Sequence, residues 1–502
     1  MLLLGYDIGS SAIKASLLDA ATGQPVATAC SPKSEMPIIA KQPGWAEQHP
    51  ETWWEHVCAA SAELRDTVGA RFADVRAIGI SYQMHGLVVV DQNLEVLRPA
   101  IIWCDSRAVD TGARAFATLG PDRCWARLLN SPGNFTASKL AWVKEEEPAL
   151  YRRIHKFMLP GDFIALKMTG EVCATASGLS EGILWDFADE RVADFVLDHY
   201  GIASDLVPPM VGTFGVQGRL THGAAEVLGL PAGIPLAYRA GDQPNGAFSL
   251  NVLHPGEIAA TAGTSGVVYG VSTRAVHDPR SRVNTFLHVN HAPGRPRYGI
   301  LLCVNGTGIL NSWLKHHLWP STGLGYEEMN AAAATAPVGS AGLVVLPFGN
   351  GAERTLGNRN IGASFHGLEL NIHTRAHVAR AVQEGIVFAL NHGMDALREM
   401  GLEVETVRAG HANMFLSPVF TEIVATVTGA RVELYRTDGA QGAARAAGVG
   451  AGIYPSVAEA FAGLHAVRTV VPTSGLTPAY QEAYRHWLGV LEADLARPVR
   501  GC

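Results

Sequence analysis

The feature that most constrains how this chain can fold is a segment at residues 2–19 that recurs halfway along the sequence. An apolar run enters a turn of glycine and serine at residues 9–11, and apolar and polar residues alternate after it. This pattern predicts a β-hairpin. Residues 257–272 repeat it, with a Gly-Thr-Ser-Gly turn at 263–266 in register with the first turn. One copy at the start of each half predicts two related domains that face a shared cleft.

The first hairpin turn is suited to a phosphate and a metal ion. Its backbone N–H groups and the hydroxyls of Ser10 and Ser11 can face a phosphate, and Asp7 stands where the first strand enters the turn. A carboxylate beside a phosphate is typical of a bridging Mg²⁺. A carboxylate at a strand end can also cap neighbouring amides, but the Ile-Gly-Ser-Ser sequence that follows Asp7 favours a metal or phosphate. The recurrence of the turn around Thr264 favours the phosphate interpretation, and we expect a nucleotide in the cleft.

Composition favours a soluble globular protein over a nucleic-acid-binding or membrane protein. The 502 residues are 48% hydrophobic and 17% charged, and the formal net charge is −7. Such a chain can bury a large core, and it has no basic surplus to attract nucleic acid or an anionic membrane. No targeting segment or long apolar run is evident, so we expect a cytoplasmic protein. Seven widely spaced cysteines predict reduced thiols: Cys30, Cys58, Cys104, Cys124, Cys173, Cys303 and Cys502.

Short apolar segments in the first half predict a sheet whose strand ends carry polar groups. Strands at 75–81 and 87–91 flank Tyr-Gln-Met-His-Gly at 82–86, and a third strand at 100–103 ends in Cys-Asp-Ser-Arg at 104–107. In open α/β sheets, polar groups gathered at adjacent strand ends build substrate pockets. We therefore expect a pocket here.

Periodicity and helix breakers predict the other elements. We expect a strand at 25–29 and a helix that begins at Pro50 and buries Trp53, Val57, Ala60 and Leu64. In the second half we expect a helix at 377–400, a strand at 404–410, and a helix at 415–427 ended by Gly429. Residues 138–170 are predicted to be helical with breaks at Pro148 and Pro160. Residues 201–233 are predicted to be connecting structure, and the chain from residue 459 is predicted to be helical.

Asp242 is the main candidate for a catalytic base. It lies in a Gly-Asp-Gln-Pro-Asn-Gly segment at 241–246 that follows a predicted strand at 234–240. A lone carboxylate in such a turn ordinarily satisfies its own backbone. At the junction of the two halves, however, it can accept the proton of a sugar hydroxyl that attacks a γ-phosphoryl group.

The strand ends at 82–86 and 103–105 suggest a polyol site. Carboxylates and imidazoles hydrogen-bond hydroxyl groups and an indole packs on C–H faces, which suits Asp105, His85 and Trp103. A histidine between two apolar strands is also consistent with a satisfied core residue. The sequence has no P-loop, no protein-kinase motif pair and no zinc-hydrolase motif.

Taken together and in order, these segments resemble the FGGY family of carbohydrate kinases over nearly the whole chain. The resemblance rests on YDIGSSAIK (6–14), WAEQHPETWW (45–54), YQMHG (82–86), RPAIIWCDSR (98–107), FTASKLAWV (135–143), MLPGDFIALKMTGE (158–171), GDQ (241–243), TAGTSG (261–266), GAERT (351–355), ARAVQEGIVFAL (379–390) and GAQGAARAAG (439–448).

The resemblance implies an α/β protein with two actin-like, ribonuclease-H-like domains (1–247 and 248–502), an interdomain cleft for ATP and sugar, and possible homodimers. It implies that Asp242 is the catalytic base and that Asp7 and Asp242 are the carboxylates that bind Mg²⁺. Sugar contacts are implied for Met84, His85, Trp103, Asp105, Asp242 and Gln243. Nucleotide contacts are implied for Ser10, Ser11, Lys14, Thr264, Gly308, Gly410 and Asn413.

Within the family, the motifs are most similar to those of members that act on D-xylulose, which implies ATP-dependent phosphorylation of that ketose at O5. Met84-His85 stands where members acting on glycerol carry Arg-Glu. Gln243, Pro244-Asn245 and Ala409-Gly410 depart from the xylulose pattern, so another ketose or polyol, such as ribulose or glycerol, stays open. A non-catalytic actin-like sugar sensor and a chaperone-type ATPase are the alternatives from other classes.

Overall fold

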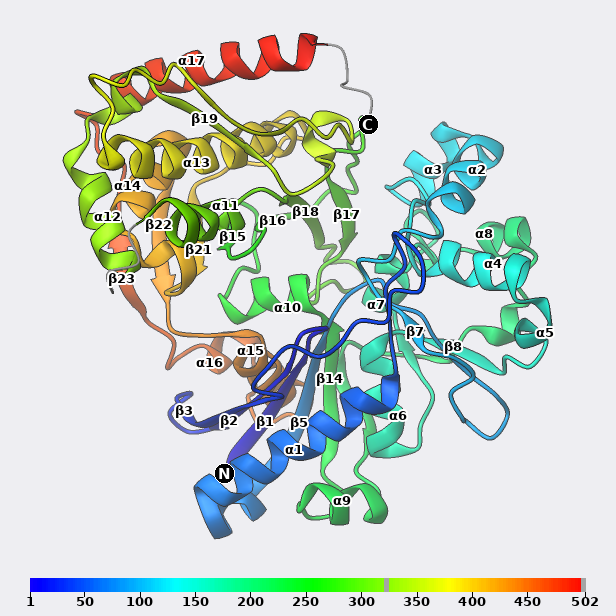
Figure 1. Ribbon diagram of the computed structural model, residues 1–502. Helices are drawn as coiled ribbons and strands as arrows, with labels where there is room; N and C mark the ends of the chain where they lie inside the picture. Colours follow the sequence, from blue (N-terminus) through cyan, green and yellow to red (C-terminus); the bar gives the residue numbers. More distant parts are fainter. Residues whose placement is uncertain (320–324, 498–502) are drawn as a thin grey trace. The chain divides into compact units, whose positions relative to one another are not determined.

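The computed structural model describes residues 1–319 and 325–497, and the chain separates into two compact units. The first unit comprises Met1–Asn251, Thr285–Tyr298 and Thr437–Leu464. The second comprises Val252–Asn284, Gly299–Arg436 and His465–Cys502. Each unit has one large sheet with helices packed on it (Figure 1).

Both predicted hairpins are confirmed. In the first unit β1 (Leu2–Ile8) pairs antiparallel with β2 (Ile13–Asp19), and in the second β15 (Glu257–Ala262) pairs antiparallel with β16 (Gly266–Ser272). The other edge of each hairpin's first strand pairs with a parallel strand, β5 (Val75–Tyr82) for β1 and β21 (Thr406–Gly410) for β15. The two hairpins therefore occupy equivalent positions in their sheets.

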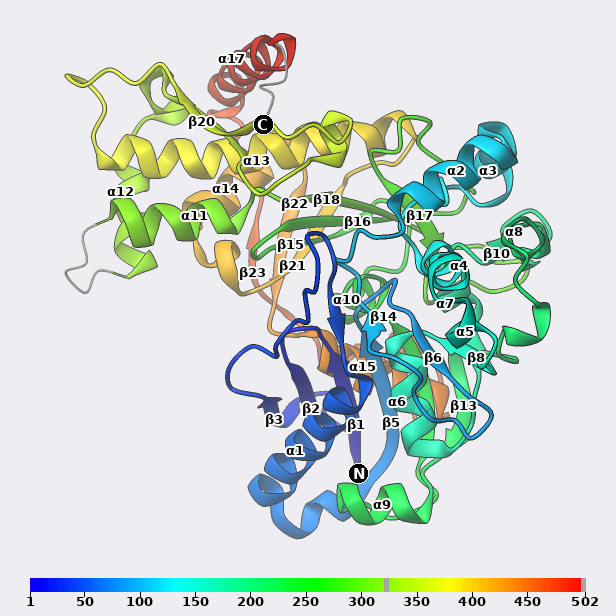
Figure 2. The same cartoon turned by 45° about the vertical axis from the view of Figure 1, so that its right-hand side comes forward.

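The first sheet has the strand order β13-β14-β5-β1-β2-β3. It adds β3 (Pro25–Ser31), where a strand was expected, β13 (Phe214–Arg219) and β14 (Pro235–Gly241). Helix α1 (Pro50–Val68) begins at Pro50 and buries the predicted face, with Trp53 fully buried. It packs on β2 and β3, whereas α15 (Gly439–Gly450) packs on β1 and β5. Figures 1 and 2 show α1 and α15 on opposite faces of this sheet.

Small residues let α15 approach the sheet closely. A β-carbon on Gly5 of β1 would lie 1.9 Å from the main-chain oxygen of Ala440, and one on Gly79 of β5 would lie 2.1 Å from that of Ala443. Both strands therefore require glycine where the helix crosses them. This packing explains the Gly- and Ala-rich composition of 439–448 and fixes where the helix begins, beside the end of β1.

The second sheet has the order β17-β18-β16-β15-β21-β22-β23, with β17 (Asn284–Leu287), β18 (Tyr298–Val304), β22 (Arg431–Tyr435) and β23 (Ala466–Val470). Its longest helix, α13 (Arg375–Glu399), confirms the helix predicted at 377–400 and is buried along most of its length. Helix α14 (Pro418–Thr428) ends at Gly429 in the left-handed conformation, as expected. Helix α17 (Thr477–Ala496) follows β23.

For three stretches the prediction was confirmed only in part: the helices with breaks at Pro148 and Pro160 and the C-terminal helix are present, whereas several short elements were missed. Residues 138–170 form α4 (Thr136–Glu146), α5 (Pro148–Tyr151) and α6 (Pro160–Thr169), with strand β8 (Lys156–Met158) between the last two. Both prolines begin helices, because the first helical position needs no N–H. The supposed connecting region 201–233 holds β13 and α9 (His222–Leu228), and the region after 459 holds edge strand β23. These short or edge strands carry too few alternating residues for periodicity to reveal them.

The remaining strands and α-helices of the first unit are β4 (Glu47–Gln48), β6 (Val88–Val90), β7 (Ala100–Ile101), β9 (Ala174–Thr175), β10 (Trp185–Asp186), β11 (Arg191–Val192), β12 (Met210–Val211), α2 (Val109–Leu119), α3 (Pro121–Arg127), α7 (Ala176–Glu181), α8 (Asp194–Tyr200), α10 (Asp242–Ser249) and α16 (Val457–Ala460). Those of the second are β19 (Val344–Phe348), β20 (Gly362–His366), α11 (Gly308–Trp313) and α12 (Tyr326–Thr335).

Within residues 1–319 and 325–497, no helix has the length and apolar character needed to cross a membrane. The six cysteines in these ranges are free thiols, and Cys502 lies outside the described residues.

Candidate active site

Asp7 lies near the end of β1 among groups that fix its carboxylate. The hydroxyl of Ser81, its register partner on β5, donates a hydrogen bond to Oδ1 (2.8 Å). A β-carbon on Gly439, the first residue of α15, would lie 2.7 Å from Oδ2, so only glycine leaves the carboxylate its place. Burial raises the pKa of Asp7, opposed by Lys14 across the hairpin and by Ser81, and the charge of Asp438 raises it further.

Asp242 reaches the same edge of the sheet from a different strand. The expected turn is instead the start of α10, and Asp242 is its first residue, directly after β14. Strands β1 and β14 both run parallel to β5, so their carboxyl ends meet at one edge. Burial raises the pKa of Asp242 to about 7, the negative charge of Asp7 adds to the rise, and hydrogen bonds from Gln243 oppose it. The titration of Asp242 is thus shifted towards neutral pH.

The two carboxylates fit a magnesium ion. Both offer oxygen ligands, which Mg²⁺ prefers, and Gly439 leaves open space beside Oδ2 of Asp7 that a β-carbon would fill. In the described part of the chain, no three His, Cys, Asp or Glu side chains converge to form a closed metal cage. Mg²⁺ is usually held by one or two carboxylates, with water and phosphate oxygens completing its shell.

Met84 lies beside Gly241, the residue before α10, and His85 follows Met84 in the chain. Met84 is buried, and a β-carbon on Gly241 would lie 2.6 Å from its Cγ. The carbonyl of Glu181 accepts a hydrogen bond from Nδ1 of His85 (3.0 Å), and the His85 ring packs edge-on against Phe135, with 4.8 Å between centroids. The structure therefore brings Met84 against Gly241. Glu181 adjoins both segments, because its carbonyl binds the His85 ring and its Oε2 would lie 3.1 Å from a β-carbon on Gly241.

Trp103 and Asp105 have different surroundings. Trp103 is 53% exposed and its Nε1 donates a hydrogen bond to Oγ of Ser10 (3.2 Å), which joins a predicted sugar residue to a predicted phosphate residue. Asp105 is fully buried and accepts hydrogen bonds from the backbone N–H of Ala46 (2.6 Å) and from the guanidinium of Arg107 (2.7 Å). These contacts fix the loop after Trp103, and a sugar contact for Asp105 stays a prediction.

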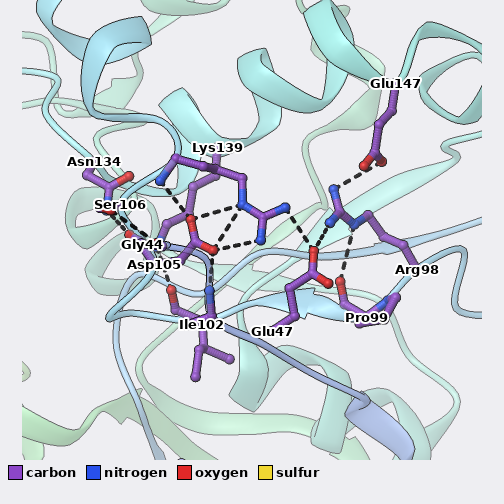
Figure 3. Close-up of polar contacts among 12 residues, drawn as sticks. Gly44, Glu47, Arg98, Pro99, Ile102, Asp105, Ser106, Asn134, Lys139 and Glu147 are labelled. Atoms are coloured by element: carbon purple, nitrogen blue, oxygen red, sulfur yellow. Dashed lines mark hydrogen bonds and ion pairs between the residues drawn. The ribbon is translucent and has the colours of Figure 1, made fainter. Parts of the chain in front are cut away.

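Asp105 belongs to a buried charge network (Figure 3). Arg107 also donates to Glu47 (2.8 Å), and Glu47 pairs in turn with Arg98, which reaches Glu147 (3.0 Å). The network ties β4, where Glu47 lies, to the loop that follows β7. A paired and hydrogen-bonded arrangement is what allows such charges to be buried.

Sequence reasoning missed two buried residues beside this site. Lys139 of α4 is fully buried and donates hydrogen bonds to the main-chain oxygens of His85 (2.8 Å) and Ile102 (3.0 Å). Burial lowers its pKa to about 7, opposed by the charge of Asp105. Glu181 is 2% exposed, and Oε2 lies 3.7 Å from Nδ1 of His85. The sequence could have indicated Lys139, because a lysine among the apolar residues of a predicted helix is unusual. Nothing in the sequence indicated a role for Glu181.

The second unit contains a cavity of about 710 Å³. Thr264, Gly308 and Asn413 line it, whereas Gly410 does not and its neighbour His411 does. A β-carbon on Gly308 would lie 2.0 Å from the main-chain oxygen of Gly263, so glycine is required where α11 meets the hairpin turn. The volume is within the range of small-molecule sites. The remaining predicted nucleotide residues, Ser10, Ser11 and Lys14, belong to the first unit.

Two units, each built on a hairpin with a parallel partner strand, one bearing paired carboxylates and one a cavity, define a two-domain actin-like kinase fold. Residues 2–249 match the N-terminal domain and residues 258–451 the C-terminal domain of the FGGY family of carbohydrate kinases. The chain belongs to this family, as its motifs predicted, and is a sugar kinase.

Relatives and solved structures agree with this assignment. The chain is 31% identical to a xylulose kinase of Escherichia coli (95% of this chain, 96% of the relative). It is 30% identical to an L-xylulose/3-keto-L-gulonate kinase of the same organism (98% of each). The crystal structure of xylulose kinase from Rhodospirillum rubrum is similar with a TM-score of 0.87 and 28% identity, over 99% of this chain and all of that one. The predicted fold class is confirmed.

Proposed function

We propose that this kinase transfers the γ-phosphoryl group of ATP to O5 of D-xylulose and releases D-xylulose 5-phosphate and ADP. The observation that carries the proposal is the packing of Met84 against Gly241, the residue before Asp242, with His85 next to Met84 in the chain. An apolar side chain and an imidazole next to a base suit a neutral polyhydroxy ketone, whose hydroxyls need hydrogen-bond partners and whose carbon chain needs packing. The xylulose kinases among the relatives support the same substrate.

Asp242 acts as the general base. Its pKa of about 7 leaves it ionised in a large fraction of molecules at neutral pH, yet basic enough to take the hydroxyl proton as the oxygen attacks phosphorus. Its place in the first turn of α10 also favours the ionised form, because the helix dipole is positive there. Gln243 hydrogen-bonds the same carboxylate and orients it.

Asp7 and Asp242 would hold Mg²⁺, which when bound neutralises charge on the transferring phosphoryl group. Ser81 orients the Asp7 carboxylate for this role through its hydrogen bond. We assign phosphate and nucleoside contacts to Ser10, Ser11 and Lys14 in the first unit and to Thr264, Gly308, Gly410 and Asn413 in the second. A domain division at 247/248, a cytoplasmic location and a homodimer remain parts of the proposal.

The test is ADP release with ATP and Mg²⁺ over a panel of D-xylulose, D-ribulose, L-ribulose, L-xylulose, 3-keto-L-gulonate and glycerol. D-xylulose should give the highest kcat/KM by a wide margin. A higher value for any other acceptor refutes the substrate assignment, and no turnover with any of them refutes the proposed reaction.

L-xylulose and 3-keto-L-gulonate are the second candidates. A relative with these substrates in its name is as similar to the chain over its full length as the xylulose kinases are. These ketoses differ from D-xylulose in configuration or in a terminal carboxylate, so the same panel separates the two assignments.

A further inference from the structure

Lys139 is the only lysine in the described part of the chain whose side chain is fully buried. Removing an ammonium group from water is costly unless it is hydrogen-bonded and paired with an opposite charge. Two main-chain oxygens accept hydrogen bonds from Lys139, and the negative charge of Asp105 opposes the fall in its pKa. Figure 3 shows Lys139 beside Ile102 and beside Asp105, which belongs to the buried charge network.

The two oxygens that Lys139 binds belong to different loops of the candidate sugar site. One is that of His85, in the turn between β5 and β6. The other is that of Ile102, the residue before Trp103. A single amine therefore joins the loop of the proposed imidazole contact to the loop of the exposed indole.

The His85 loop needs such a tether. His85 has a φ of 62°, a left-handed conformation that is unfavourable for a residue with a β-carbon. Strained backbone of this kind persists only where the surrounding structure holds it. The hydrogen bond from Lys139 to the His85 carbonyl acts on the backbone, whereas Glu181 and Phe135 hold the ring.

We propose that Lys139 is a positioning residue of the sugar site, whose amine fixes the Met84-His85 turn and the Trp103 loop relative to each other. The inference rests on the proposed function, in which His85 and Trp103 contact the ketose. It assigns Lys139 no contact with the substrate: its effect passes through the two carbonyls.

The first experiment measures hydrogen–deuterium exchange in the full-length protein, so it does not depend on which acceptor the enzyme uses. Lys139→Met should accelerate exchange in peptides covering 82–88 and 100–107, with the second unit unchanged. Lys144→Met is the matched control. Lys144 lies on the same helix and also donates to a main-chain oxygen, that of Tyr200 (2.8 Å), away from both loops. Unchanged exchange in both segments of Lys139→Met overturns the inference.

The second experiment is a double-mutant cycle with the best acceptor of the panel. Lys139→Met should raise the KM for the acceptor about tenfold or more with the KM for ATP unchanged, and should add little in a His85→Ala background, because coupled residues are not additive. Full additivity overturns the inference, and so does an equal rise in both KM values, the signature of general destabilisation. If the wild-type protein has no activity, only the proposed function is refuted. The hydrogen–deuterium exchange experiment still tests whether Lys139 holds the two loops, because it needs no activity.

Discussion

Replacing Asp242 by asparagine should lower kcat by orders of magnitude and, at the same time, stabilise the folded protein at alkaline pH. The two effects have one cause, which is that burial and the charge of Asp7 raise the pKa of this carboxyl from its ordinary 3.8 to about 7. Asparagine has nearly the same shape and cannot accept the proton, so kcat should fall by about 10²- to 10⁴-fold, the usual contribution of a general base.

The stability effect has a definite sign and pH window. Between about pH 4 and pH 7 the folded state keeps the Asp242 proton that the unfolded chain has lost. Stability therefore falls as pH rises through this window and stays lowered above it. At pH 8 the cost is at most about 4 kcal/mol, since each pKa unit corresponds to about 1.4 kcal/mol. The asparagine side chain does not titrate, so Asp242→Asn removes this cost and also relieves the like charge on Asp7.

The assay is chemical unfolding of both proteins at pH 4.5 and pH 8, followed by tryptophan fluorescence. Asp242→Asn should be close to wild type at pH 4.5 and more stable at pH 8. Asp110→Asn, which changes an exposed aspartate of α2, is the control and should show no such difference. Equal stability of wild type and Asp242→Asn at both pH values would refute the reasoning, as would near-wild-type turnover.

Three further predictions concern the two carboxylates, Asp7 and Asp242, and the cavity of the second unit. The kcat/KM for the ketose should fall about tenfold per pH unit on the acid side of pH 7 as Asp242 is protonated, and a flat profile down to pH 5 would contradict the base assignment. Gly439→Ala places a β-carbon 2.7 Å from Oδ2 of Asp7, so it should raise the Mg²⁺ concentration needed for half-maximal rate. Gly489→Ala, in open space on α17, serves as its control, and identical Mg²⁺ dependence would exclude Asp7 from the metal site. Gly308→Ala places a β-carbon 2.0 Å from the main-chain oxygen of Gly263, at the edge of the second unit's cavity. The KM for ATP should rise and the KM for the ketose should stay unchanged. A rise in the KM for the ketose alone would contradict a nucleotide role for this cavity.

What the sequence could predict is local. Each hairpin is set by a period of two and a glycine turn, and α1 by Pro50 and an apolar stripe, so neighbouring residues carry all the information. The placement of Asp7 and Asp242 at one edge followed from their positions at strand ends. The predicted role of Met84 and His85 as sugar contacts came from the resemblance to the family.

What the sequence could not predict depends on packing between distant residues. The Gly and Ala run at 439–448 gives no sign that it crosses β1 at Gly5, and the lysine at position 139 gives no sign of which carbonyls it will bind. Asp105 illustrates the same limit. Its position after a strand suggested an open carboxylate, whereas Arg107 and a backbone amide occupy it in the fold.

The packing of α15 also determines the order in which the molecule can be completed during synthesis. The face of β1 and β5 that carries Gly5 and Gly79 is covered by a helix made more than three hundred residues later. A ribosome-bound nascent chain therefore exposes that apolar face until residue 450 has emerged, and the first unit closes only after most of the second has been translated. Truncation before residue 439 would leave an intact hairpin in an unfinished unit.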